Sequence, residues 1–249
     1  MRSHFWIIAA FVVTSAMVTS ESRAAIISLA AVQDASANPS ASTTNYDGQL
    51  VRVTRQTSPA GALPRGVGMV AFDLSSIAGQ TITAAHLEYY QVSSTSVGAH
   101  VHEVYSHNPA DGVGMFNEST ITYDAYVSTY ASPANGESVA AIALGALSLA
   151  SNSADNVYHV GGSADAADLA YLNSRASKTN AIDQYAQFLL WHLGNNGATS
   201  GTQSRRVFGD LESGNPVRLV LTVVPEPSAI ILIGMGIVGV AVMRPRKRK

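Results

Sequence analysis

The chain has 249 residues and no cysteine, which excludes disulfides, thiolate nucleophiles, iron–sulfur clusters and cysteine-based zinc sites. Seven of the fifteen lysine and arginine residues lie in the two terminal segments, but of the seventeen acidic residues only Glu21 and Glu226 do, so the middle of the chain carries a net charge near −7. A surface of that sign repels nucleic-acid phosphates, and nucleic acid is not expected as a partner.

The N-terminal end has the features of a secretory signal peptide. A short basic start at residues 1–4 precedes an apolar run at residues 5–18, which is too short to span a bilayer as an ordinary helix. Small residues at Ser22 and Ala24 then suit signal peptidase. We predict a signal peptide over residues 1–24, exported through the Sec translocon and cleaved after Ala24 or Ala25. The alternative is an uncleaved N-terminal anchor.

Residues 25–224 have the size and pattern of a single all-β domain. Short β-prone runs alternate with clusters of Gly, Pro, Asn, Asp and Ser, which is typical of a sandwich. The predicted strands are residues 49–54, 67–74, 82–92, 99–105, 119–123, 139–144, 156–160, 188–193 and 217–224. One short helix is predicted over residues 164–174, where Leu169 and Leu172 are three apart and acidic residues come early.

No recognisable catalytic motif is present, so we do not expect an enzyme. Paired carboxylates for glycoside hydrolysis could still come from the fifteen acids of the domain.

Two groups of residues have metal-ligand chemistry. His100 and His102 lie two apart on a predicted strand and so share one face, with His107 just beyond. Oxygen ligands suited to Ca²⁺ gather near the start of the domain, although Asx residues also form turns. These oxygen-bearing residues are Asp34, Asn38, Asn45 and Asp47. We interpret them as turn residues and the histidines as exposed, and expect no cofactor, with Ca²⁺ as the alternative.

Aromatic and arginine side chains are the candidates for binding a polysaccharide, because rings stack on sugar C–H groups and guanidinium groups grip carboxylates. Tyr89 and Tyr90 are adjacent on a strand and must point to opposite faces, so at most one of them is a core residue. The other aromatic candidates are Tyr105, Tyr123, Tyr126, Tyr130 and Trp191. Arg65, Arg205 and Arg206 are the candidates for uronate groups, and structural pairing with Asp73, Glu88 or Glu118 is the alternative.

The C-terminal end combines a Pro225-Glu226-Pro227 triplet, an uncharged apolar run at residues 229–243 and a basic tail. The prolines suit neither a strand ladder nor a helix interior, which predicts an extended, accessible stretch between the last strand and the membrane. As a helix the apolar run covers about 22 Å and forms a short transmembrane segment. The tail residues that predict a cytoplasmic C-terminus are Arg244, Arg246, Lys247, Arg248 and Lys249.

Together, residues 224–249 resemble the PEP-CTERM sorting signal. The resemblance implies an exosortase as partner, cleavage near Pro225-Glu226-Pro227, and a host that makes exopolysaccharide. On this basis residues 225–249 form the sorting signal, and the protein is expected first in the membrane of the cell envelope and then at the cell surface or in the extracellular matrix.

The domain in turn resembles the DNRLRE-type domains. The similar segments are residues 65–77 (RGVGMVAFDLSSI), 81–90 (TITAAHLEYY), 116–124 (FNESTITYD), 204–208 (SRRVF) and 216–221 (PVRLVL). Phe116 and Tyr123 stand where that family usually has tryptophans, and Gly209-Asp210 where it has Lys-Glu. The resemblance implies a jelly-roll-like β-sandwich that binds carbohydrate or serves as a structural part of a surface protein.

These observations predict an exported, exosortase-sorted surface or matrix protein that is non-catalytic and contacts exopolysaccharide. The alternatives are a secreted polysaccharide-degrading enzyme and a purely structural matrix protein without glycan binding.

Overall fold

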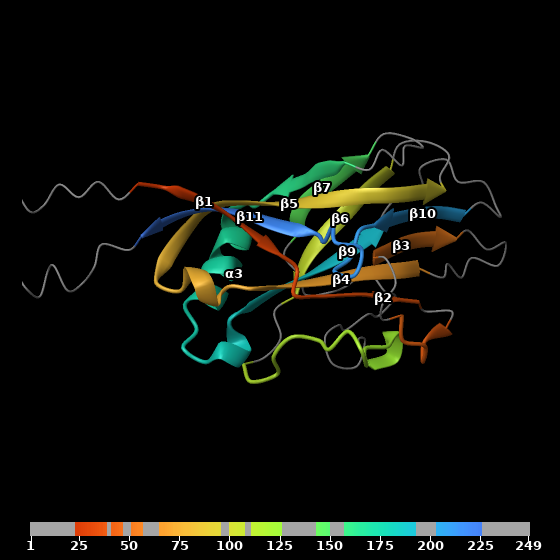
Figure 1. The fold of residues 1–249 in the computed structure, drawn as a ribbon, viewed down its shortest axis with the longest axis horizontal. Helices are drawn as coiled ribbons and strands as arrows, with labels where there is room; N and C mark the ends of the chain where they lie inside the picture. The colour runs from red at the N-terminus through yellow and green to blue at the C-terminus, as the bar shows by residue number, and fades with distance from the viewer. Residues whose placement is uncertain are drawn as a thin grey trace, which may run out of the picture.

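The computed structural model describes residues 23–38, 41–46, 51–56, 65–95, 100–107, 111–125, 143–149, 157–192 and 203–225. For most of β3, β6, β7 and β10 this description covers the backbone alone. Within the described residues the chain is mostly antiparallel β-strand (Figure 1).

The strands are β1 (Ala25–Ala30), β2 (Gln33–Ala37), β3 (Val51–Gln56), β4 (Arg65–Asp73), β5 (Gln80–Thr95), β6 (His100–His107), β7 (Ala143–Leu149), β8 (Tyr158–Ser163), β9 (Tyr185–His192), β10 (Gln203–Phe208) and β11 (Arg218–Pro225). The helices whose bounds lie within the described residues are α3 (Ala166–Ala176) and the short 3₁₀ turns η2 (Ser75–Ile77) and η3 (Ala181–Asp183).

The strands form two antiparallel layers that are joined along one side. One layer contains β1, β11, β5 and β8, and the other contains β2, β4, β9, β6 and β7. Strands β10 and β3 connect the layers, because β10 pairs with both β5 and β3, and β3 pairs with β4. The all-β class predicted from the sequence is therefore confirmed.

The side chains of β11 alternate between buried and partly exposed positions, so the residue pattern determines which face of the strand packs on the core. Leu219, Leu221 and Val223 are fully buried, whereas the residues between them are partly exposed. This period of two places one face of the strand on the core and the other in solvent.

Strand β4 has both faces buried, because a loop covers its outer side. Val70 and Phe72 face the main core, while Val67 and Met69 belong to a second apolar cluster. Residues 111–125 cover that cluster and contribute Phe116 to it. A strand covered on both sides can be continuously apolar, as this one is.

The main core lies between the two layers and includes one face of α3. Its residues are fully or almost fully buried, and Phe72 contacts Phe188 edge to face with ring centroids 5.9 Å apart. Tyr171, Leu172 and Ala176 supply the contribution of α3. Burying a large side chain such as Leu172 or Phe188 stabilises the fold by roughly 1.5–3 kcal/mol.

The predicted short helix is confirmed, two residues later than expected. Asp165 is the N-cap, and its carboxylate accepts hydrogen bonds from Ala167 N and Asp168 N at 2.7 and 3.0 Å. The Asp168 side chain completes a capping box with the backbone of Asp165. At its C-terminal half the helix is fixed to β5, because the Asn173 side chain hydrogen-bonds both N and O of Ile82.

The strand predicted over residues 119–123 is wrong. The Asn117 side chain accepts hydrogen bonds from the Ser119 backbone and hydroxyl at 3.0 and 2.7 Å, and the chain turns at Thr120. Such an Asx turn removes the backbone groups that a strand would pair. In addition β1, β2 and β10 were not predicted as strands. Residues 1–22 of the predicted signal peptide and all residues after Pro225 lie outside the described residues.

Candidate functional site

The outer face of the β11–β5–β8 layer carries aromatic and charged side chains. On β5, Tyr89 is fully buried while Tyr90 points outward and is half-buried, as the alternation predicted. On β8, Tyr158 lies directly opposite Tyr90. On β11, Arg218 is opposite Glu88, the outward residue two before Tyr90.

The two tyrosines and Arg218 form one cluster, here called the aromatic face. The rings of Tyr90 and Tyr158 meet edge to face with centroids 5.2 Å apart, and the guanidinium carbon of Arg218 lies 4.0 Å from the centroid of Tyr158. The Tyr158 hydroxyl donates to the Pro216 carbonyl at 3.2 Å, which fixes the ring. Partial burial raises the pKa of Tyr158 although Arg218 opposes this, so the hydroxyl stays protonated at neutral pH.

This arrangement has the chemistry of a sugar-binding surface. Aromatic rings offer faces for the C–H side of a pyranose, and a guanidinium offers paired donors for a carboxylate. Further outward groups on the same layer include Glu88, His86 and the 63% exposed Val160. A chain of sugars could therefore contact both apolar and polar groups here.

A second cluster consists of the carboxylates of Asp34, Asp210 and Glu212, which have oxygens within 4.8 Å of one another. Asp34 and Asp210 are buried, at 4% and 3% exposure, and Glu212 is exposed. We call these three residues the acidic group.

The topology explains why these acids meet. After β1 the chain crosses to the other layer, where Val32 N donates to the Ala71 carbonyl and Asp34 pairs with Val70. Strands β10 and β11 pair with successive parts of β5, so residues 209–217 form an excursion between them. Leu211 N of that excursion donates to Asp34 Oδ2 at 2.9 Å and joins the two segments.

The excursion has a defined turn. The Asp210 carboxylate accepts from Ser213 N at 2.7 Å, and Asp210 N donates to the Ser213 hydroxyl at 3.1 Å. Gly209 precedes this turn, and a Cβ at that position would overlap the Asn215 carbonyl oxygen. The close approach of backbone to backbone explains the glycine.

Electrostatics set the acidic group apart from ordinary surface acids. Burial raises the pKa of Asp34 to about 7, the Leu211 N–H opposes the shift, and Asp210, Glu212 and Glu118 add to it. Glu118 also accepts a hydrogen bond from Asp34 N at 3.0 Å. At neutral pH the group therefore shares a proton or needs a compensating cation, and carboxylate oxygens are ligands that Ca²⁺ takes.

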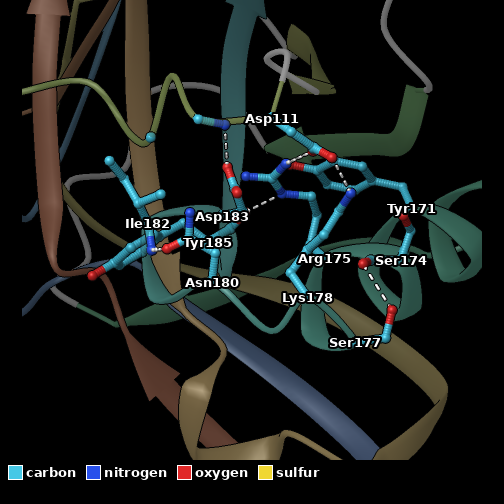
Figure 2. Close-up of polar contacts among 12 residues, drawn as sticks. Asp111, Tyr171, Ser174, Arg175, Ser177, Lys178, Asn180, Ile182, Asp183 and Tyr185 are labelled. Atoms are coloured by element: carbon cyan, nitrogen blue, oxygen red, sulfur yellow. Dashed lines mark hydrogen bonds and ion pairs between the residues drawn. The ribbon is translucent and has the colours of Figure 1, made fainter.

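A third cluster joins α3 to the loop at residues 111–116. Figure 2 shows Asp111 between Arg175 and Lys178, at 3.7 Å and 2.6 Å. The hydrogen bond from Lys178 holds the pKa of Asp111 below its ordinary value. Arg175 is 1% exposed and donates from Nε to the Tyr185 carbonyl at 3.0 Å, while Gly112 N donates to Asp183. These contacts fix the loop over β4, and we assign them a structural role.

Of the four residues considered as an alternative calcium site, the three that the structure describes do not assemble as a set. Asn45 donates instead to the carbonyls of Glu118 and Ile121, both at 2.7 Å, and so supports the loop. Asn38 accepts from Ala41 N in a turn, and Asp47 lies outside the described residues. Among those three described residues, Asp34 alone joins the acidic group.

For several other candidate binding residues the structure describes the backbone but not the side chain. His100 and His102 lie on β6, where His102 is opposite His192 of β9, but their side chains are outside the description. The same holds for His107, Tyr105 and Trp191, and for the side chains of Arg65, Arg205 and Arg206. Tyr126 and Tyr130 are outside it altogether. Asp73 accepts from Ser75 N and forms a turn.

Sequence reasoning missed Tyr158, Arg218, Asp210 and Glu212. A tyrosine in a predicted strand and an arginine at the start of another were visible signals. Their partners were not, because the pairing of β8 and β11 with β5 joins segments far apart in the chain.

Of the predicted sorting signal at residues 225–249, the structure describes only the first residue, Pro225. β11 includes Pro225, which is exposed and pairs with Gln80, so the strand runs one residue further than predicted. Pro225 is tolerated there because a strand end needs no further donor. Ala24 is exposed and Ala25 begins β1. Outside the described residues lie Glu226, Pro227, Arg244, Arg246, Lys247, Arg248 and Lys249.

Within the described part of the chain, no helix has the length and apolar character needed to cross a bilayer, and the predicted membrane segment at residues 229–243 is not among those residues.

A search of curated proteins finds no match to this chain. A family model described as the PEP-CTERM protein-sorting motif matches residues 223–247. That match supports the sequence resemblance at the C-terminal end, and with it an exported protein that is sorted by an exosortase and located at the cell envelope or surface.

Proposed function

We propose that this protein is a non-catalytic component of the extracellular matrix that contacts the exopolysaccharide of its own cell through the aromatic face. Sorting by an exosortase brings it to the surface, after export through the Sec pathway and removal of the signal peptide. The DNRLRE-type resemblance, with its jelly-roll-like domain, supports a carbohydrate-binding or structural role.

The observation that carries the proposal is the partly exposed Tyr90–Tyr158 pair with Arg218 over the Tyr158 ring. Stacking a sugar on an aromatic ring buries apolar surface, which contributes roughly 25 cal/mol per Å², and a charge-assisted bond to a uronate adds roughly 1.5–3 kcal/mol. Repeated weak contacts along a polymer give useful avidity.

A catalytic role is the second candidate, and the acidic group is the observation that favours it. A carboxyl group whose pKa is raised to about 7 beside other carboxylates is typical of a general acid in polysaccharide hydrolysis. Against this, Asp34 and Asp210 are almost completely buried, so a substrate could reach only Glu212.

Binding to purified exopolysaccharide tests the proposal. The mature protein should bind saturably, and Tyr158→Ala or Arg218→Ala should weaken binding roughly tenfold, the equivalent of about 1.4 kcal/mol. Tyr185→Ala is the matched control, because Tyr185 is a half-buried tyrosine on the other layer.

Each outcome assigns a function. No saturable binding by the parent protein indicates a purely structural matrix role. Release of new reducing ends, abolished by Glu212→Gln, indicates a degrading enzyme. An intact mass that still ends at Lys249 in the presence of the exosortase contradicts processing.

A further inference from the structure

The matched sorting motif begins inside the folded sheet. Its first residue, Val223, is fully buried and lies between two strands, opposite Ala25 of β1 and Ile82 of β5. The next two residues of the motif pair with Thr81 and Gln80. The motif is therefore continuous with the sandwich, without a separate linker before Pro225.

Both ends of the domain leave the sheet at the same place. Figure 1 shows β1 beginning where β11 ends. Ala25, Thr81 and Pro225 are exposed there, and Ile26 is exposed to 78%. We call Ala25, Ile26, Gln80, Thr81 and Pro225 the terminal face.

Chain length keeps the terminal face close to the membrane. Only residues 226–228 separate Pro225 from the apolar run that starts at Ala229. Four residue steps span at most about 14 Å, and the polar headgroup layer alone occupies roughly 5–8 Å on each side of the bilayer. An enzyme that holds Glu226 at the membrane must therefore also touch the terminal face.

A groove of about 820 Å³ adjoins the terminal face on the side of α3. Gln80 and Thr81 belong to both, and Asn173, Lys178 and Gln184 line the groove further on. None of the described residues that line it carries a carboxylate, although the domain as a whole is acidic. The groove thus offers amide and hydroxyl groups and one cation to an approaching polypeptide.

We propose that the terminal face, with this groove, is the docking surface for the membrane-embedded sorting enzyme. The enzyme reads the Pro225-Glu226-Pro227 triplet as the continuation of β11 on the folded domain. This inference rests on the proposed sorting and adds the folded domain to the triplet, the apolar run and the basic tail as an element that is recognised.

The test is the rate at which the full-length precursor is shortened in cells that contain the exosortase, followed by pulse-chase and intact mass. Ile26→Arg and Thr81→Arg place bulky cations on the terminal face at exposed positions, where folding tolerates them. Val160→Arg is the matched control, since Val160 is 63% exposed on β8 and pairs with Glu88. That pairing places it about 23 Å along β5 from Thr81.

We expect both terminal-face variants to be processed about tenfold more slowly than Val160→Arg, as for loss of an interface residue worth more than 1 kcal/mol. Glu226→Ala should block processing in every background. If it does, and the terminal-face variants keep the parent rate, docking is overturned while sorting stands. If Glu226→Ala is processed at the parent rate, both the docking proposal and the proposed exosortase sorting are overturned.

A spacer gives an independent measurement. Six Gly-Ser residues inserted after Val224 leave the triplet, the apolar run and the basic tail intact, and move them up to about 20 Å from the β1 and β5 residues of the terminal face. We expect slower processing. Faster processing would mean that the folded domain hinders the enzyme, which contradicts docking.

Discussion

Replacing Asp34 by Asn should stabilise the domain at pH 8 and leave its stability almost unchanged at pH 4. Burial raises the pKa of Asp34 from 3.8 to about 7, opposed by the Leu211 N–H and assisted by Asp210, Glu212 and Glu118. Between about pH 4 and pH 7 the folded state keeps a proton that the unfolded state has lost. The free energy of unfolding of the parent therefore falls as the pH rises through this range.

The size of the effect follows from the shift. About three pKa units at 1.36 kcal/mol each correspond to ~4 kcal/mol, which is a large part of the 5–15 kcal/mol that stabilises a typical domain. Asn is neutral at every pH and keeps an oxygen that accepts the 2.9 Å hydrogen bond from Leu211 N. The Asp34→Asn variant should therefore lose this pH dependence.

Urea unfolding followed by circular dichroism between pH 4 and pH 8 measures the difference. A chelator must be present, because a divalent cation held by the acidic group would offset the same penalty. Glu212→Gln is the control, since it removes one neighbouring charge but leaves Asp34, and should reduce the pH dependence without abolishing it. Equal pH dependence in the parent and Asp34→Asn would refute the reasoning.

Other substitutions test the packing and the local structure, each by the free energy of urea unfolding. Phe72→Ala empties a fully buried site in the main core and should cost about 3–5 kcal/mol, and a cost below 1 kcal/mol would contradict the packing. Asp165→Ala removes the N-cap of α3 and should cost ~1 kcal/mol, whereas no change would mean that the capping bonds do not form. Gly209→Ala should cost more than Gly79→Ala, because the first meets a backbone carbonyl while the second meets no atom and loses only about 1–2 kcal/mol from its positive φ. A larger loss for Gly79→Ala than for Gly209→Ala would contradict the close approach of Gly209 to the Asn215 carbonyl.

Local pattern was enough for the fold class and for the direction of individual side chains. Alternation predicted that Tyr89 and Tyr90 face opposite sides, and the structure buries the first and turns the second outward. The early acids and spaced leucines predicted α3 to within two residues. Strand propensity failed at residues 119–123, because the Asn117 side chain binds Ser119 and turns the chain there.

Long-range pairing decided the candidate sites. Asp34 and Leu211 are joined by a hydrogen bond across 177 positions, and no local pattern indicates which strand of one layer meets which loop of the other. Tyr158 and Arg218 reach the aromatic face for the same reason, since β8 and β11 both pair with β5.

The amino-acid sequence by itself determined the all-β class and the sorting end, because hydrophobic period and a contiguous terminal motif are local properties of a chain. Only the tertiary structure decided that three acids share one site, that an aromatic pair lies under an arginine, and that the sorting motif begins within the sheet beside β1. These depend on strand order and register, which are set by the packing of the whole core.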